Sequence, residues 1–156
     1  MGNQHVYETV VTWTGNRGTG TSSYRDYSRD HDITADGRAA IAGSSEPAFR
    51  GDPARWNPEQ LLVVSLSQCH MLWYLHLCAV NGVVVTSYVD HAVGTMEETA
   101  DGSGRFTAVT LRPAIVVASG DMAAKAGQLH EEANRMCFIA NSVAFPVHHE
   151  PTVTAG

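Results

Sequence analysis

The sequence predicts an α+β fold in which antiparallel sheets pack around one long buried helix. Strand-like alternation occurs in two separate groups, and a strongly apolar helical run lies between them. Hydrophobic residues make up 44% and charged residues 17% of the 156 residues, which is typical of a globular chain with a core of its own. We therefore expect a single domain over residues 1–156.

Three short strands are expected in the N-terminal part, between residues 5 and 43. His5–Trp13 alternates as a strand does, Tyr24–Ile33 reads as a second strand, and Ala39–Gly43 as a short third one. A Gly-rich turn over residues 14–23 separates the first two. Residues 44–55 contain two prolines and a glycine and indicate an irregular loop.

A central helix is expected over residues 57–80. Asn57 suits the N-cap, Pro58 the first helical position, and Gln60 completes a capping box. The pair Asn81-Gly82 indicates the end of the helix. Because apolar residues occur on both sides of this helix, we expect it to be buried nearly all round.

The C-terminal part is predicted to be a hairpin followed by a second helix. Val83–Glu98 and Arg105–Ala118 are long strand-like runs joined by the turn ADGSG, so the hairpin spans residues 83–118. A second helix and a C-terminal segment are expected over residues 121–154, with the helix at 121–135. A short third helix after Cys137 and a last strand over Phe145–Val153 complete the prediction.

Charge and composition exclude several classes of partner. A formal net charge of −6 and a pI near 5.7 provide no basic surface for nucleic acid or an anionic membrane. The N-terminus lacks the layout of a signal peptide, and Ser67, Gln68 and His70 interrupt the longest apolar stretch, so we expect no membrane span. Three cysteines without paired spacing are typical of a reducing compartment, and we expect a cytoplasmic protein.

The three cysteines differ in what they can pair with. Cys69 and Cys78 are nine residues apart, which places them on opposite helix faces and about 13 Å apart along the axis. They cannot form a disulfide there, because bridged Cα atoms lie within about 7 Å. The remaining pairs all involve Cys137, and Cys78 is expected to be a packed core thiol.

Cys69 needs a nearby cation to become a reactive thiolate, because a cysteine in mid-helix gains nothing from the helix N-terminus. An arginine would supply a permanent charge and would itself need a carboxylate to orient it. Glu59, in the first helical turn, is the natural carboxylate, although a glutamate there also simply favours the helix dipole. Five arginines are candidates for the cation: Arg17, Arg25, Arg29, Arg50 and Arg55.

These residues carry a resemblance to a known family. The run NPEQLLVVSLSQC, from Asn57 to Cys69, resembles the signature of the OsmC/Ohr family of thiol-dependent peroxidases, which reduce organic hydroperoxides. The run LHEEANRMCFIANSVAFPV is similar to the segment that holds the family's resolving cysteine, at Cys137. The loop VTWTGNRGTG is similar to the one that carries the active-site arginine, at Arg17. The resemblance extends from about residue 5 to residue 154 and includes the order of strands and helices.

The resemblance implies a role for each of four residues. Cys69 would attack the peroxide as a thiolate and become a sulfenic acid. Arg17 would hold the thiolate and polarise the peroxide, and Glu59 would fix the guanidinium. Cys137 would then form a disulfide with Cys69, which an external dithiol reduces; in the family this reductant is often a lipoylated protein. No cofactor is implied.

Helix geometry predicts that this site is shared between two chains. Ten residues along one straight helix separate Glu59 from Cys69 by about 15 Å, with a rotation of roughly 80°. We therefore expect an intertwined homodimer in which one chain contributes Cys69 and Cys137 and the other contributes Arg17 and Glu59. The family's habit of dimerisation and a fully apolar central helix agree with this expectation.

The sequence also departs from the family pattern and leaves choices open. Many members have proline after the resolving cysteine, whereas this chain has Phe138. Arg25, Arg29 and Arg50 compete with Arg17 for the role of the active-site arginine. An apolar pocket for an alkyl or lipid hydroperoxide has four candidate lining residues, each of which would serve equally well in a core: Phe49, Trp56, Met71 and Trp73.

Three other functions compete with the peroxidase. Metal ligands could come from Cys69-His70, from His130 with Cys137, or from residues 148–150, but none has the spacing of a recognised metal site, so no metal is expected. A Cys-His hydrolase would need a histidine held against Cys69, and His70 is adjacent and points away. A non-enzymatic protein of the same fold, which binds a small apolar ligand or acts in stress, is the remaining alternative.

Overall fold

The computed structural model describes residues 2–156 and consists of two compact units, residues 1–61 and 62–156. The boundary lies near the start of the long helix α1 (Pro58–Val80), which runs without a break from one unit into the other. Each unit is considered by itself below. The single domain over residues 1–156 stays a prediction.

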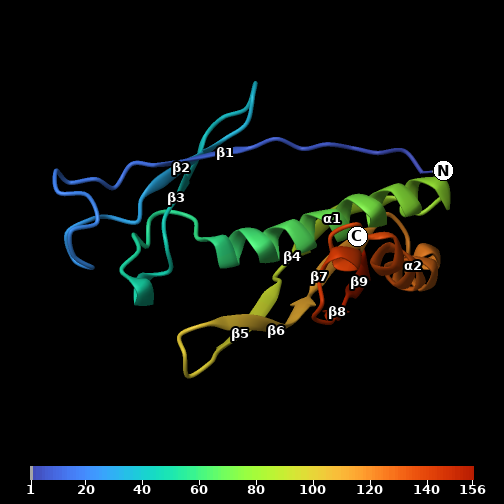
Figure 1. Cartoon of the computed structure of the whole chain (residues 1–156). Helices are drawn as coiled ribbons and strands as arrows, with labels where there is room; N and C mark the ends of the chain where they lie inside the picture. Colours follow the sequence, from blue (N-terminus) through green and yellow to red (C-terminus); the bar gives the residue numbers. More distant parts are fainter. Residues whose placement is uncertain (1) are drawn as a thin grey trace. The chain divides into compact units, whose positions relative to one another are not determined.

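The N-terminal unit contains one antiparallel sheet of three short strands in the order β1-β2-β3 (Figure 1). The strands are β1 (Val10–Trp13), β2 (His31–Thr34) and β3 (Ile41–Gly43), and a short 3-10 helix, η1 (Pro47–Phe49), follows them. All three expected strands exist, but each is shorter than the sequence predicts. Pairing begins at Val10, opposite Thr34, so the preceding residues have no neighbouring strand in this sheet. Alternation indicates an extended chain, whereas a strand also needs a hydrogen-bonded partner.

Helix α1 begins and ends where the sequence predicts. Asn57 and Gln60 form the reciprocal capping box, with the Gln60 N–H donating to Asn57 Oδ1 at 2.8 Å and the Asn57 N–H donating to Gln60 Oε1 at 3.2 Å. At the other end Gly82 adopts φ +72°, a left-handed conformation that favours glycine. The N–H of Val83 then donates to the carbonyl of Cys78 at 2.9 Å and closes the helix end.

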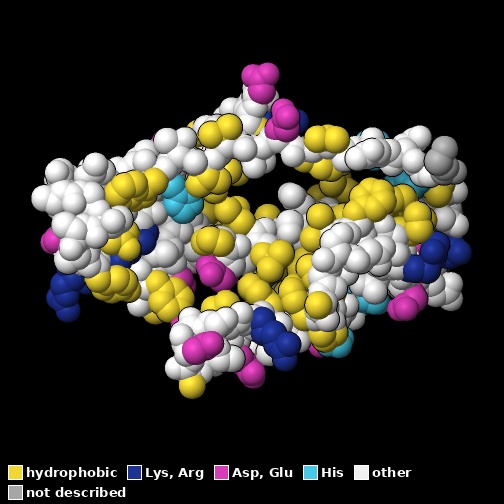
Figure 2. Space-filling view, in the orientation of Figure 1, with side chains coloured by type: hydrophobic (Ala, Val, Ile, Leu, Met, Phe, Trp, Pro, Cys, Tyr) yellow, Lys and Arg dark blue, Asp and Glu magenta, His cyan; other side chains and the backbone are white. Residues whose placement is uncertain are grey.

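The expectation that α1 is buried all round is wrong for the single chain. Its buried residues follow one stripe at intervals of four: Leu66, His70, Tyr74 and Cys78. On other faces Leu72 is 62% exposed and Val80 is 64% exposed, and hydrophobic side chains reach the surface around the position of α1 (Figure 2). One chain covers one stripe of this apolar helix and leaves the rest open.

The sequence was interpreted as having no segment fit to span a membrane, but helix α1 meets the length and composition of one. With 23 residues, and a mean hydropathy of 1.4 over an 18-residue window, α1 could cross a membrane by length and composition alone. The polar residues within it therefore do not exclude a span on that criterion. The buried stripe of α1 nevertheless belongs to two core clusters of the C-terminal unit, as is typical of the central helix of a folded domain.

Two mixed three-stranded sheets form the C-terminal unit, in the orders β4-β7-β9 and β5-β6-β8. The expected hairpin over residues 83–118 exists, but each of its long arms breaks into two strands that belong to different sheets. Asp90 holds this corner: its Oδ1 accepts from the Arg112 N–H at 2.6 Å and its Oδ2 from the Ser67 hydroxyl at 2.5 Å. The four strands are β4 (Val85–Asp90), β5 (Val93–Glu98), β6 (Gly104–Leu111) and β7 (Pro113–Val117).

The C-terminal strands correct the expectation of purely antiparallel sheets. The predicted strand at Phe145–Val153 is two strands, β8 (Val147–His149) and β9 (Thr152–Ala155). β8 pairs in parallel with β6, and β9 pairs in parallel with β7. Pro151 separates them, because it has no N–H with which to continue a ladder.

Helix α2 (Ala123–Met136) packs against α1 through a row of small and apolar residues. It follows the 3-10 turn η2 (Gly120–Met122), and the predicted third helix is the 3-10 turn η3 (Ala140–Ser142). The larger core cluster joins Tyr74 and Cys78 of α1 to Ala126, Leu129 and Ala133 of α2. A smaller cluster surrounds Leu66, Val109 and Leu111.

Candidate thiol active site

Cys69 and Cys137 belong to the same unit and come from different elements. Cys69 lies in the middle of α1 and is half-buried, whereas Cys137 is the C-cap residue of α2 and only 1% exposed. Both are free thiols. The backbone N–H of Ala140, in the turn after α2, points to Cys137 Sγ at 3.4 Å and fixes this sulfur where the helix ends.

The two thiols lie near enough to interact, and the interaction affects the acidity of Cys137. Burial raises the pKa of Cys137 to about 11, and a hydrogen bond with the Cys69 side chain adds to the increase. The N–H of Ala140 acts in the opposite direction but does not compensate for burial. At neutral pH Cys137 is therefore a protonated thiol that faces Cys69, as a resolving cysteine would be before its partner is oxidised.

Aromatic side chains beside the two cysteines border an apolar cavity. Trp73, one turn after Cys69, meets the ring of Phe138, next to Cys137, edge to face at 5.6 Å between centroids. A cavity of about 260 Å³ is lined by Leu72, Trp73 and His76 on the same part of α1. An apolar molecule bound there would lie beside the turn of helix that carries Cys69.

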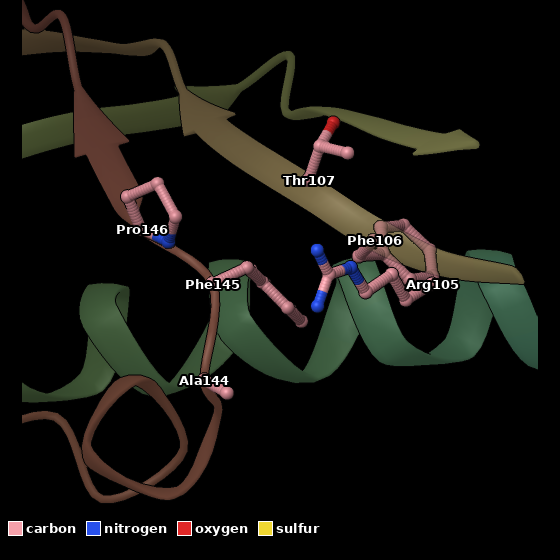
Figure 3. A pocket seen from close by; sticks show the side chains of 6 residues that line it. All are labelled: Arg105, Phe106, Thr107, Ala144, Phe145 and Pro146. Atoms are coloured by element: carbon pink, nitrogen blue, oxygen red, sulfur yellow. The ribbon is translucent and has the colours of Figure 1, made fainter.

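A second cavity of the C-terminal unit has a different character. Its volume is about 340 Å³, and Figure 3 shows the side chains of Arg105 and Phe145 pointing toward one another across it. The rings of Phe106 and Phe145, 5.5 Å apart, pack against the core cluster around Leu66. Its lining residues come from β6 and from the segment before β8, and neither cysteine of the candidate site lies on these elements.

Arg17 lies in the N-terminal unit on a loop with a defined shape. The side-chain oxygen of Asn16 accepts from the N–H groups of Gly18 at 2.9 Å and Gly20 at 3.0 Å, and both glycines have positive φ. This turn presents Arg17 to solvent. Within the described N-terminal residues, Arg17 forms no ion pair with Glu59 or with another carboxylate.

Three of the competing arginines are engaged locally. Arg29 donates to the carbonyls of Tyr24 and Tyr27, at 2.7 Å in both cases, and its guanidinium lies over both rings. Arg50 also lies over the Tyr24 ring, at 5.9 Å from its centroid. Arg55 faces Asp30 and Asp32 at 3.7 and 3.6 Å. These contacts favour Arg17 and Arg25 as arginines that remain available for another partner.

Glu59 has an unusual environment for a carboxylate. Its Oε2 atom is buried and has no hydrogen-bond partner among the residues that the structure describes. A buried carboxylate oxygen without a partner is costly, and a guanidinium is the partner that best fits it.

A family comparison agrees with this architecture. Residues 51–152 match the family model described as OsmC-like protein. The chain belongs to the OsmC/Ohr family. Its OsmC-like α+β fold confirms the fold class that the sequence predicts.

Solved structures of OsmC/Ohr proteins have the same fold. An OsmC-like protein of unknown function from Vibrio cholerae is 33% identical, with a TM-score of 0.85 over 96% of this chain and 100% of that one. Organic hydroperoxide resistance proteins from Legionella pneumophila and Elizabethkingia anophelis are 18% and 17% identical, with TM-scores of 0.67 and 0.66. They cover 97% and 99% of this chain and 99% and 100% of their own. No curated protein matched the chain.

The pocket and core residues that the sequence suggested for this OsmC/Ohr protein divide between the units. Trp73 lines the cavity beside the thiols, whereas Trp56 lines a cavity of about 290 Å³ in the N-terminal unit. Phe49 and Met71 line neither of these two cavities. Cys78 is a buried core residue whose pKa is raised by burial, in agreement with the prediction of a packed thiol.

The sequence did not predict a buried pair of histidines next to the thiols. His70 Nε2 lies 3.0 Å from His130 Nδ1, and both side chains are fully buried. The one available signal was position, since His70 lies on the same helical stripe as Leu66 and Tyr74. Over residues 2–156 no three His, Cys, Asp or Glu side chains are grouped closely enough to hold a metal ion.

Proposed function

We propose that this protein is a thiol-dependent peroxidase that reduces organic hydroperoxides. The observation that supports this most directly is that the thiols of Cys69 and Cys137 lie near enough to interact, close in the chain to residues that line an apolar cavity. Membership of the OsmC/Ohr family agrees with it, because organic hydroperoxide resistance proteins are among the structural neighbours.

The proposed reaction needs two steps at sulfur and one reductant. The Cys69 thiolate attacks the terminal oxygen of the hydroperoxide, the O–O bond breaks, and the departing alkoxide takes a proton and leaves as the alcohol. The Cys137 thiol then attacks the sulfur of the Cys69 sulfenic acid, which forms the disulfide and releases water. An external dithiol, for which a lipoylated protein is the proposed source, reduces the disulfide and is itself oxidised.

We further propose that a homodimer completes the site, with Arg17 and Glu59 supplied by the second copy. Helix α1 is continuous, so Glu59 and Cys69 remain about 15 Å apart along its axis. The buried Oε2 atom of Glu59 has no partner among the described residues, which fits a carboxylate that receives its arginine from outside. The exposed apolar side chains of α1 supply a surface for the second copy.

A hydroperoxide consumption assay tests the function. With cumene hydroperoxide and dihydrolipoamide, we expect turnover by the wild-type protein and its loss in Cys69→Ser. Cys78→Ser is the matched control, because Cys78 is a thiol of the same helix that faces the core. Full turnover by Cys69→Ser would refute the proposal.

Mass spectrometry after one equivalent of hydroperoxide tests the second step. The expected product is a disulfide between Cys69 and Cys137, with a mass loss of about 2 Da from two thiol protons. A stable sulfinic acid on Cys69, with Cys137 still reduced, would show that Cys137 does not resolve the intermediate.

The alternative is a protein of the same fold that binds a small apolar ligand without turning it over. The cavity beside Trp73 favours this reading, since it accommodates an apolar group whether or not the thiols react. Quenching of tryptophan fluorescence by cumyl alcohol, without consumption of hydroperoxide by the reduced protein, would support it.

A further inference from the structure

We propose that the buried hydrogen bond between His70 and His130 positions Cys69 against Cys137 for disulfide formation. The inference rests on the proposed function for its biological meaning, but it concerns a property of the two thiols that can be measured without any peroxide. Both histidines act as positioning residues, because no contact described above joins either imidazole ring to a cysteine sulfur.

The histidine pair forms a cross-link between the two helices that carry the thiols. His70 Nε2 and His130 Nδ1 are 3.0 Å apart, and their rings are nearly parallel, at 5°. His70 is 1% exposed and His130 is completely buried. Away from water this bond is not weakened by competition from solvent, so it constrains both helices.

Each histidine is linked along its own helix to one of the cysteines. His70 is the residue after Cys69, and its ring holds the turn of α1 from which Cys69 projects. His130 precedes Cys137 by seven residues, or nearly two full turns, which brings both to the same face of α2. If α1 slid along α2, the hydrogen bond would therefore lengthen, and the two thiols would move apart at the same time.

Neighbouring contacts make the hydrogen bond part of a rigid interface. Tyr74, one turn after His70, stacks on His130 with 3.9 Å between ring centroids. Its hydroxyl donates to the carbonyl of Ala126 at 2.9 Å, one turn before His130. The two helices are thus joined at successive turns, and Cys69 and Cys137 lie at one end of this row.

The histidines cost stability, which indicates a role other than filling the core. His70 Nδ1 and His130 Nε2 are buried and have no hydrogen-bond partner among residues 2–156. Whichever tautomers are present, one buried N–H and one buried lone pair remain unsatisfied. Apolar residues of similar size would pack there without this penalty, but they would not define the register between helices by a directional bond.

The measurable consequence is the stability of the Cys69–Cys137 disulfide. In a glutathione buffer the dithiol protein reacts with one oxidised glutathione to give the disulfide and two reduced glutathiones. The equilibrium constant reports how well the folded protein holds the two sulfurs together, as an effective concentration. The reaction contains no hydroperoxide and needs no turnover.

The experiment compares variants that remove the bond with variants that keep it. His130→Ala should lower the equilibrium constant at least tenfold, which corresponds to about 30 mV. His130→Asn and His70→Gln place an amide near the bonded imidazole nitrogen and should restore most of the wild-type value. The double variant His70→Leu/His130→Leu, which removes the unsatisfied nitrogens, should unfold at least as late in urea as the wild type and still show the lowered constant.

Leu129→Ala is the matched control. Leu129 is the neighbour of His130 on α2 and packs in the core cluster that contains Tyr74, but its side chain has no polar atom with which to bond across the helices. The Leu129→Ala variant should destabilise the fold and leave the equilibrium constant within about threefold of wild type, since it does not break the hydrogen bond between His70 and His130. Equal loss in Leu129→Ala and His130→Ala, or an unchanged constant in the double leucine variant, would overturn the inference.

The results separate this inference from the proposed function. A histidine-dependent disulfide without hydroperoxide turnover would retain the inference and refute the peroxidase. Hydroperoxide turnover by a protein whose disulfide equilibrium does not depend on the histidines would support the peroxidase and refute the inference. If the wild-type protein forms no Cys69–Cys137 disulfide in oxidised glutathione, the inference is wrong.

Discussion

Among single residues, the two buried histidines have strongly lowered pKa values. Burial lowers the pKa of His70 to about 4, with a further effect of His149, and the pKa of His130 to about 3, with further effects of His70 and His149. His149 in turn faces Glu131 at 3.4 Å. Both buried imidazoles are therefore neutral across the physiological range.

We predict that acid destabilises the protein between pH 6.5 and about 4. In that window the unfolded chain binds protons at His70 and His130, whereas the folded chain does not, so stability is complete above pH 6.5 and falls as the pH decreases. The expected loss is on the order of 1 kcal/mol per pH unit for each histidine. Urea unfolding at pH 7, 6 and 5 measures it. The double leucine variant should lose less over the same range, and equal losses would contradict the explanation.

Exposure distinguishes the three thiols. Cys69 is half-buried, whereas Cys78 and Cys137 are both 1% exposed and burial raises the pKa of each. Iodoacetamide at pH 7.5 should therefore modify Cys69 first, and the other two should react at the slow rate at which the fold opens. Peptide mass spectrometry over time checks the order. Modification of Cys137 as fast as Cys69 would show that Cys137 is not sealed in the core.

At the scale of elements, α1 combines a local signal with a role that depends on its surroundings. The capping box and the terminal glycine define where the helix begins and ends. Its apolar residues lie on all sides, so composition alone does not identify the face that packs inside the chain. Packing against α2 and the strands chooses the stripe of Leu66, His70 and Tyr74.

We predict different effects of two leucine truncations in α1. Leu66 is completely buried, so Leu66→Ala should cost about 2–5 kcal/mol of unfolding free energy through lost burial and a cavity. Leu72 is 62% exposed, and Leu72→Ala should cost less than about 1 kcal/mol within the chain itself. Guanidinium unfolding of the two variants at the same low protein concentration provides the comparison. Similar losses would mean that Leu72 is covered within the fold.

The strands over residues 83–118 can be recognised from the sequence, but the way they pair into sheets cannot. The arms of the hairpin over residues 83–118 are strand-like along their whole length, yet each serves two sheets. Asp90 produces the corner through hydrogen bonds to residues 67 and 112, far from it in the sequence. Alternation is a property of neighbouring residues, whereas this corner depends on distant ones.

At the scale of the whole molecule, the exposed apolar side chains of α1 predict self-association. Sedimentation equilibrium should give a dimer for the wild-type protein and a shift toward monomer for Leu72→Asp, because a carboxylate would have to be buried at the interface. Ser103→Asp adds the same charge at the exposed β5–β6 turn and should remain dimeric. A monomeric wild-type protein with full peroxidase activity would contradict the shared site.

Mixing inactive variants tests whether the site is shared. Cys69→Ser lacks the attacking thiol and Arg17→Ala lacks the proposed cation, so each homodimer should be inactive. In a mixture refolded at equal concentration, half of the dimers are mixed and one of their two sites is intact, which predicts about a quarter of wild-type activity. No recovery would place all four residues within one chain or assign the cation to another residue, such as Arg25.

Sequence patterns indicated the family and the candidate site residues. The interval from Glu59 to Cys69, the segment around Cys137 and the loop around Arg17 carried the family resemblance, and the ends of α1 followed from capping residues that act within four positions. Only the folded chain brings Cys69 near Cys137, bends the hairpin into two sheets, and joins His70 to His130 across sixty positions of chain. Local hydrogen bonds and periodicity can be seen in neighbouring residues, whereas contacts between distant residues depend on how the helices and sheets share one core.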